Sequence, residues 1–178
     1  LLLADESVDP SFVALCWQLP EFEVLVNARA QVDIDGLLGT RRALRLKLAH
    51  DHAALLGRRY DALAMQSPDA LDAAASAARR LKNTCLHYLG LVEGDGARAF
   101  AQFERAGTLT DRLAALTVLI HGGAVQAETA LDAFQQRVGD DLLLNDKWIA
   151  AVATRPQPGA LDEVLDLLSS PHWHPCNP

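Results

Sequence analysis

The sequence has few aromatic residues, no closely spaced cysteines and no long apolar run, and each shortage excludes a class of protein. Only 6% of the residues are aromatic, which argues against β-rich folds, because these use more aromatic and β-branched side chains. No apolar segment approaches the roughly 20 residues that a membrane-spanning helix needs. The three cysteines, Cys16, Cys85 and Cys176, form no C-x-x-C pair, so we expect reduced thiols of a cytoplasmic protein.

The sequence also lacks an initiating Met, a basic N-terminal flank and an excess of positive charge. Without a basic flank, the opening leucines do not resemble a signal peptide, and the missing Met suggests a piece of a longer chain. With a net charge of −7, we expect neither a nucleic acid nor an anionic membrane as partner. Half of the 178 residues are hydrophobic, which excludes disorder and suits one domain over residues 1–178.

Charge is distributed unevenly along the chain. Residues 1–40 have a net charge of −6, residues 41–60 have +5, and the remainder has −6. The bases of the middle block alternate with leucines at helical spacing, which predicts the solvated face of an amphipathic helix or intramolecular ion pairs rather than a nucleic-acid patch. This basic block consists of Arg41, Arg42, Arg45, Lys47, Arg58 and Arg59.

The order of caps, apolar stripes and breaks predicts an all-α fold. Asp33 or Asp35 is expected to cap a long helix over residues 36–65, with an apolar stripe of leucines. The segment 67–69 (Ser-Pro-Asp) predicts the start of the next helix, which runs to about Leu91. Glycine and proline positions divide the rest into further helices. The other expected helices are 10–17, 96–106, 111–120, 125–138, 142–154 and 160–168, with a short acidic element or loop at 21–34.

A weak internal repeat in the second half indicates stacked helical hairpins. A base followed by a large apolar residue recurs at 80–81, 112–113 and 147–148, with spacings of 32 and 35 residues. After each comes a break and a second amphipathic helix. This period is typical of an armadillo- or HEAT-like α-solenoid, a right-handed superhelix of helical hairpins. An irregular helical bundle is the alternative interpretation.

The histidines and the buried thiol do not suggest a catalytic centre. Motifs for a zinc peptidase helix, a nucleophile elbow and a phosphate loop are absent from the sequence. His50 and His52, two positions apart on one helix, point to different sides and are not expected to share a metal. His87 and His121 are expected near helix C-termini, where the dipole favours them. Cys85 is expected on an apolar helix face, where a thiol is inert.

The C-terminal tail comes closest to a metal site. His172, His174 and Cys176 lie within five residues, but no fourth ligand is nearby and the flanking prolines suggest a rigid connector. The paired acids at 140–141 and 162–163 fall at expected helix starts, where acids are stabilising. We therefore assign no catalytic, cofactor-binding or metal-ligating residue in this sequence.

Several ordered motifs resemble those of one known family. The segments 81–89 (LKNTCLHYL) and 108–116 (TLTDRLAAL) resemble the motifs R-N-x-C-L-x-Y/F-L and N-M-T-D-x-L-A-A-L of bacterial aminopeptidase N. The motif at 146–148 (DKW), followed by ATRP at 153–156, is similar to D-K-W-F and A-T-S-P. Leu109 and Arg155 depart from the Met and Ser common in the family. Weaker similarities lie at 19–21, 32–35, 171–173 and 177–178.

The resemblance implies a region of a larger enzyme. Bacterial aminopeptidase N is a zinc metallopeptidase, a hydrolase that removes N-terminal amino acids from peptides, and its catalytic motifs do not occur here. We expect a truncated part of its helical C-terminal domain, with N-terminal helices in 1–66, hairpin repeats in 67–170 and a cut connector in 171–178. Its role would be to cap the active site and limit substrate access, with the catalytic and linker domains as partners and zinc in the catalytic domain. The alternative is a stand-alone armadillo-like module that binds a peptide or protein.

Overall fold

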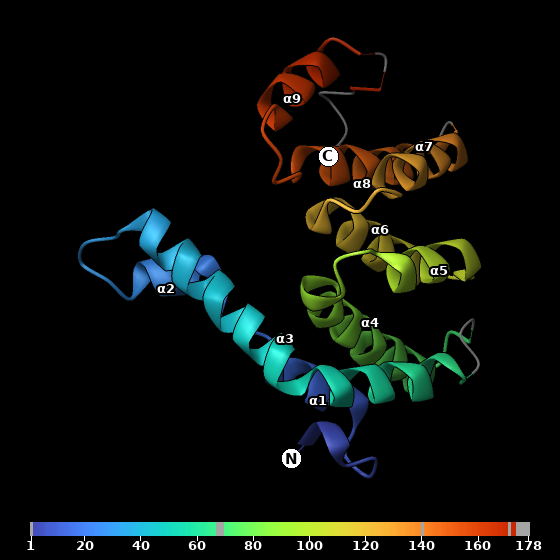
Figure 1. Cartoon of the computed structure of the whole chain (residues 1–178). Helices are drawn as coiled ribbons and strands as arrows, with labels where there is room; N and C mark the ends of the chain where they lie inside the picture. The colour runs from blue at the N-terminus through green and yellow to red at the C-terminus, as the bar shows by residue number, and fades with distance from the viewer. Residues whose placement is uncertain (1, 67–69, 140, 171, 174–178) are drawn as a thin grey trace. The chain divides into compact units, whose positions relative to one another are not determined.

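The chain folds into α-helices joined by short connections in the computed structural model, which describes residues 2–66, 70–139, 141–170 and 172–173 (Figure 1). The described residues contain no β-strand, which confirms the all-α prediction. No helix in the described part of the chain has the length and apolar character needed to cross a membrane. The helices are η1 (Leu2–Ala4), α1 (Pro10–Cys16), α2 (Phe22–Asn27), α3 (Ile34–Ala64), α4 (Ala73–Glu93), α5 (Ala97–Arg105), α6 (Leu109–Gly122), α7 (Ala127–Val138), α8 (Leu142–Ala153) and α9 (Ala160–Leu168).

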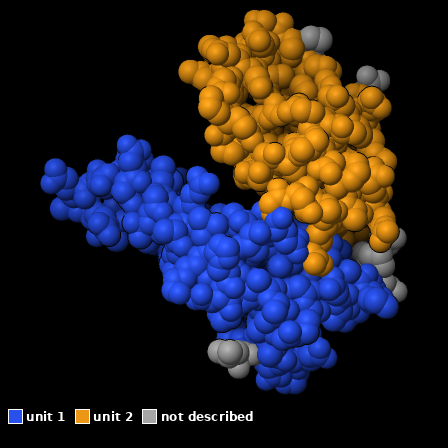
Figure 2. All heavy atoms as spheres, viewed as in Figure 1, with its two compact units in different colours: residues 1–93 blue, residues 94–178 orange. Residues whose placement is uncertain are grey.

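Contacts divide the chain into two compact units (Figure 2). Unit 1 is Leu1–Glu93 and unit 2 is Gly94–Pro178. The division falls at the end of α4, whereas the sequence suggested a change of organisation at 66–67. The single-domain assignment and its subdivision stay predictions.

Unit 1 is organised around α4, which contacts both α1 and α3. Its core is made mostly of leucines and alanines, and two of the alanines, Ala14 and Ala49, are completely buried. A small side chain lets two helix backbones approach closely, so a core of this composition needs few aromatic rings. The core side chains include Val13, Ala14, Ala49, Leu56, Leu63, Leu81, Cys85, Leu86 and Leu89.

Carboxylate caps fix where α1 and α3 begin. The Asp9 side chain accepts a hydrogen bond from the Phe12 amide at 2.9 Å, with Pro10 in the first turn of α1. The Asp33 side chain accepts from the Gly36 amide at 2.9 Å. Of the two aspartates that could cap the long helix, Asp33 is therefore the cap, because its carboxylate satisfies an amide that has no partner within the helix.

The predicted start of α4 is wrong. Residues 67–69 lie outside the described residues, but the described residues 70–72 are not helical and α4 begins at Ala73. The Asp72 carboxylate accepts from the Ala75 amide at 2.8 Å, so Asp72 caps α4, five residues after the Ser67 that the sequence predicted as its cap.

Unit 2 is a run of helices in which each packs on the next. Contacts join α5 to α6, α6 to α7, α7 to α8 and α8 to α9, and α6 also touches α8. The base-plus-apolar repeats at 112–113 and 147–148 lie in α6 and α8, and α7 and α9 follow them. Contact between corresponding helices of successive hairpins is the arrangement expected of a helical repeat.

The connections in unit 2 are closed by local hydrogen bonds. Thr108 and Asp141 cap α6 and α8 through their side-chain oxygens. Gly123 ends α6 in the left-handed conformation, with φ +64°, which a residue bearing a Cβ rarely adopts. The Gln157 side-chain amide donates to the Ile120 carbonyl oxygen at 2.8 Å, so the segment after α8 is tied to the end of α6.

Candidate functional site

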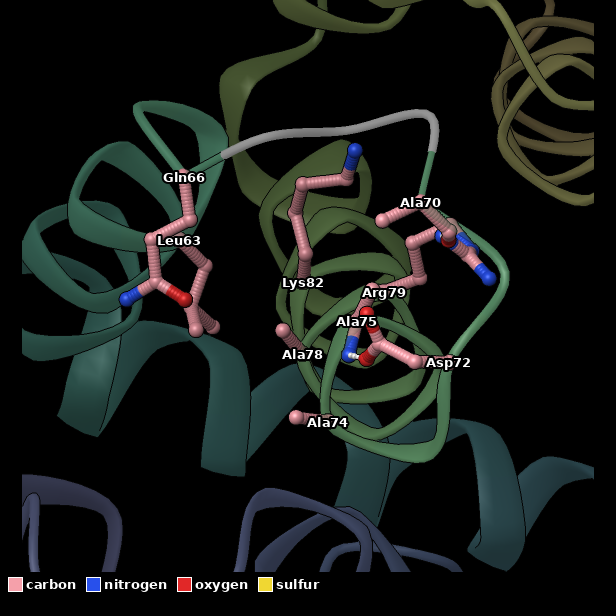
Figure 3. A pocket seen from close by; sticks show the side chains of 9 residues that line it. All are labelled: Leu63, Gln66, Ala70, Asp72, Ala74, Ala75, Ala78, Arg79 and Lys82. Carbon is pink, nitrogen blue, oxygen red and sulfur yellow. Dashed lines mark hydrogen bonds between the residues drawn. The ribbon is translucent and has the colours of Figure 1, made fainter.

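A polar hollow lies between the end of α3 and the start of α4 in unit 1 (Figure 3). Its volume is about 220 Å³. Leu63 of α3 and Gln66, which follows the helix, form one side, and the first turns of α4 with the residues just before it form the other. The lining residues are Leu63, Gln66, Ala70, Asp72, Ala74, Ala75, Ala78, Arg79 and Lys82.

The polar groups of this hollow stabilise the connection between the two helices. The buried Arg79 guanidinium donates to the Ala70 carbonyl oxygen and, at 3.0 Å, to the Ser76 hydroxyl. Asp72 is engaged as the α4 cap, and the Lys82 ammonium points away from it (Figure 3). The nine lining residues include no histidine, cysteine or serine. They therefore supply neither a thiol or serine hydroxyl nucleophile nor an imidazole base.

A second hollow in unit 1, of about 340 Å³, has apolar and aromatic walls. The Trp17 ring meets the His52 ring edge-on at 5.5 Å and the Tyr88 ring at 5.1 Å. The Tyr88 hydroxyl donates to the Trp17 carbonyl oxygen at 2.6 Å, and burial raises the pKa of this phenol. Leu2, Leu3, Cys16 and Leu55 complete the lining. Such walls suit an apolar side chain better than a bond-breaking reaction.

The described histidine rings lie in different environments. His50 is exposed, whereas the His52 ring packs on Trp17. His121 lies in the last turn of α6, as predicted, with its Nε2 3.4 Å from the Thr154 hydroxyl. The prediction for His87 is wrong, because α4 continues to Glu93 and His87 lies before its last turn. The helix dipole therefore does not explain His87.

The tail histidine packs against α7 and α8. The His172 ring lies 5.3 Å from the Trp148 ring, with its Nε2 3.2 Å from the Gln135 side-chain nitrogen, and its carbonyl oxygen accepts from the Asn145 amide at 2.6 Å. His174 and Cys176 lie outside the described residues. In the described ranges, no three His, Cys, Asp or Glu side chains come together as metal ligands.

Cys85 is the buried thiol that the sequence predicted. It is fully enclosed in the unit 1 core. Burial raises its pKa from 9.0 to about 12, although the nearby Arg59 charge acts in the opposite direction. Because the thiolate is the reactive form, this thiol is inert near neutral pH. Cys16, by contrast, is exposed.

The basic block of α3 forms the predicted ion pairs but not a uniformly solvated face. Lys47 pairs with Asp51 at 2.8 Å. Arg59 is only 8% exposed and pairs with Glu6 at 3.2 Å, which corrects the expectation that it lies on the wet side. Arg42 and Arg58 are exposed, whereas Arg41 and Arg45 are half-buried. The predicted apolar stripe of leucines is also wrong for the first half of the helix. There, Leu38 and Leu44 are exposed, and Leu37 and Leu48 are only half-buried.

For two polar side chains in unit 2, the sequence predicted no structural role. Arg155, at a position where aminopeptidase N commonly has Ser, pairs with Glu128 of α7 and, at 2.8 Å, with Glu163 of α9. Asn145 is buried within the apolar run of α8 and holds the His172 backbone. The signal for Asn145 was present, because a lone amide inside an apolar helix needs a hydrogen-bond partner. The signal for Arg155 was only its departure from the family pattern.

Comparison with known proteins finds similarity to bacterial aminopeptidases N. The chain is 31% identical over 178 residues to aminopeptidase N of Caulobacter vibrioides and 28% identical over 179 residues to aminopeptidase N of Escherichia coli, with 99% of this chain covered in both cases. These alignments cover 21% and 20% of the relatives, so the chain spans about a fifth of their length. The resemblance to bacterial aminopeptidase N is thereby confirmed.

A solved structure shares the fold. The crystal structure of Legionella pneumophila aminopeptidase A in complex with aspartic acid superposes with a TM-score of 0.83 at 23% identity, over 96% of this chain and 21% of that one. A family described as "Domain of unknown function (DUF3458_C) ARM repeats" matches residues 1–178. The ARM repeats of that description confirm the predicted armadillo-like helical repeat. The chain belongs to this family of ARM-repeat domains.

Proposed function

We propose that this chain is a non-catalytic helical region of a zinc-dependent aminopeptidase that removes N-terminal amino acids from peptides. The observation that carries the proposal is the end-to-end similarity to aminopeptidase N over 99% of the chain, combined with coverage of only a fifth of those relatives. Catalysis and zinc binding are assigned to the rest of the longer polypeptide, which we place in the cytoplasm.

The proposed role of the region is to cap the active site and to limit substrate access. The helices of unit 2 suit this role, because each packs on the next and the connections are tied by side chains such as Gln157. A rigid wall excludes bulky substrates and positions small ones without taking part in bond chemistry. The catalytic and linker domains of the same polypeptide are then its partners, and no nucleic acid or membrane takes part.

The first test is the reading frame that encodes these residues. An H-E-x-x-H motif upstream in the same frame, with zinc and aminopeptidase activity in the purified full-length protein, supports the proposal. A start codon directly before Leu1 overturns it in favour of a stand-alone binding module. The 178-residue chain by itself is expected to retain no zinc and to hydrolyse no aminoacyl substrate, and stoichiometric zinc in elemental analysis would contradict this.

The capping role is tested by substrate size. Phe134 is buried in the core of unit 2, and Leu161 is exposed on α9. In the full-length enzyme, Phe134→Ala is expected to raise kcat/KM for a long peptide relative to a dipeptide, because a loosened wall excludes less. The matched control Leu161→Ala should leave that ratio unchanged. Equal ratios in the wild type and Phe134→Ala would refute a wall that selects by size.

A further inference from the structure

The first half of α3 carries apolar side chains that the described part of unit 1 does not bury. We name residues 34–48 the α3 arm. All buried residues of α3 lie from Ala49 onward, where the helix packs on α4. In the α3 arm, Ile34, Leu38 and Leu44 are 57%, 48% and 46% exposed. Figure 1 shows this end of α3 extending away from α4 within unit 1.

Two glycines weaken the N-terminal turns of the α3 arm, although its later residues are strong helix formers. The glycines are Gly36 and Gly39, and Gly39 has open space where a Cβ would stand, so packing does not require a glycine there. Glycine is among the weakest helix formers, and a helical stretch of this length is marginal in water without tertiary packing. A covering surface would supply the apolar contacts that α4 gives to the second half of α3.

The charges of the α3 arm define the chemistry of that surface. Arg41, Arg42, Arg45 and Lys47 lie in it, and no acid occurs between Asp35 and Asp51. The Nε of Arg41 is buried and has no hydrogen-bond partner among the described residues. A carboxylate from a partner would pair with this cation, and leucines of a partner would cover Leu38 and Leu44. A nucleic acid would satisfy the arginines but leave the leucines uncovered.

We propose that the α3 arm is the surface on which the remaining part of the aminopeptidase polypeptide docks, through an apolar patch bordered by carboxylates. The inference rests on the proposed function. The occupant follows from length and charge: about four fifths of the relatives lie outside the region that this chain matches, and the arm is cationic although the chain as a whole has a net charge of −7. Burial of Leu38 and Leu44 by that polypeptide removes them from water.

The test measures thiol accessibility in the full-length protein. Leu38→Cys and Leu44→Cys are introduced separately into a background without other exposed cysteines, and maleimide labelling is timed in native and in denaturing buffer. Met65→Cys is the matched control, because Met65 directly follows the same helix and is 88% exposed. We expect about 30-fold slower native labelling at positions 38 and 44, and no more than about threefold slowing at position 65.

Several outcomes overturn the proposal. Labelling of Leu38→Cys and Leu44→Cys as fast as that of Met65→Cys shows an uncovered arm. Protection that disappears on dilution, together with dissociation in sedimentation, shows a second copy as the occupant. Charge reversal by Arg42→Glu with Arg45→Glu is expected to speed labelling of Leu38→Cys about tenfold, whereas Lys147→Glu on exposed α8 surface is not. Equal rates in these two variants would refute the carboxylate border.

The labelling experiment is independent of the proposed function. A full-length protein without zinc or hydrolysis refutes the aminopeptidase assignment, and its labelling rates still decide whether the arm is covered. An active aminopeptidase with a freely labelled arm refutes the docking surface alone. A reading frame without any further domain removes both proposals.

Discussion

Ionisation of Cys85 should make the stability of the chain depend on pH above about 9. The thiol is enclosed in the unit 1 core, and burial holds its pKa at about 12 instead of 9.0. In the unfolded chain the thiol releases its proton near pH 9. Because the folded pKa is raised, the unfolded state binds fewer protons between these values, and the stabilising contribution, complete below pH 9, is lost as pH rises toward 12.

The magnitude follows from the two pKa values of Cys85. Each pH unit in this interval is worth about 1.4 kcal/mol. The free energy of unfolding should therefore fall by roughly 1 kcal/mol at pH 10 and by roughly 3 kcal/mol at pH 11 through this thiol alone. Tyr88, whose pKa burial raises above 10.0, contributes in the same direction once pH rises above about 10.

Urea unfolding of the wild type and Cys85→Ala at pH 7, 9, 10 and 11 isolates the contribution of the thiol. The alanine variant loses packing at every pH, which displaces its curve by a constant amount, but it lacks the ionisation. The stability difference between the two proteins should therefore narrow above pH 9 by the amounts given. Tyr88 and all other groups are common to both. Parallel curves up to pH 11 would refute a raised pKa for Cys85.

Three further predictions concern unit 2. Gly96→Ala should lower the thermal unfolding temperature more than Gly94→Ala. Both glycines have φ near +69°, but a Cβ at Gly96 would lie 2.6 Å from the Ala124 Cβ, whereas Gly94 faces open space. Equal decreases in the two variants would show that the backbone conformation alone matters. Asp141→Ala should cost about 1 kcal/mol, since its carboxylate accepts from two amides at the start of α8, and an unchanged midpoint in urea would contradict that cap. Phe134→Ala should cost about 3–5 kcal/mol in urea, and a loss below about 1 kcal/mol would mean that the core closes around the gap.

Much of the fold could be predicted because capping residues, glycines and prolines mark where most helices begin and end. The prediction for 160–168 matches α9, which follows Gly159 and ends before Ser169. The start of α4 was missed because the Ser-Pro-Asp sequence at 67–69 is a strong local signal, yet Asp72 also stands in a position to cap. The sequence alone does not decide which of several capping residues in one stretch meets a free amide.

The site features that escaped prediction depend on residues far apart in the chain. Arg59 is buried and pairs with Glu6, which comes from a segment more than fifty residues away, and a helical pattern of charges contains no such information. The hollow beside Trp17 is assembled from η1, α1 and α3. The family was predicted instead from ordered motifs, because related sequences share their long-range contacts, whereas helical periodicity reports only local structure.

The continuity of α3 has a consequence for local unfolding. One helix of 31 residues, roughly 45 Å long, passes from a half packed on α4 to a half without buried side chains. Its backbone amides therefore belong to two cooperative units, although the hydrogen-bond pattern is uninterrupted. In a protein whose α3 arm is uncovered, amide hydrogen exchange would be fast near Ile34 and slow near Leu56, so the helix would fray inward from one end and stop where the core begins.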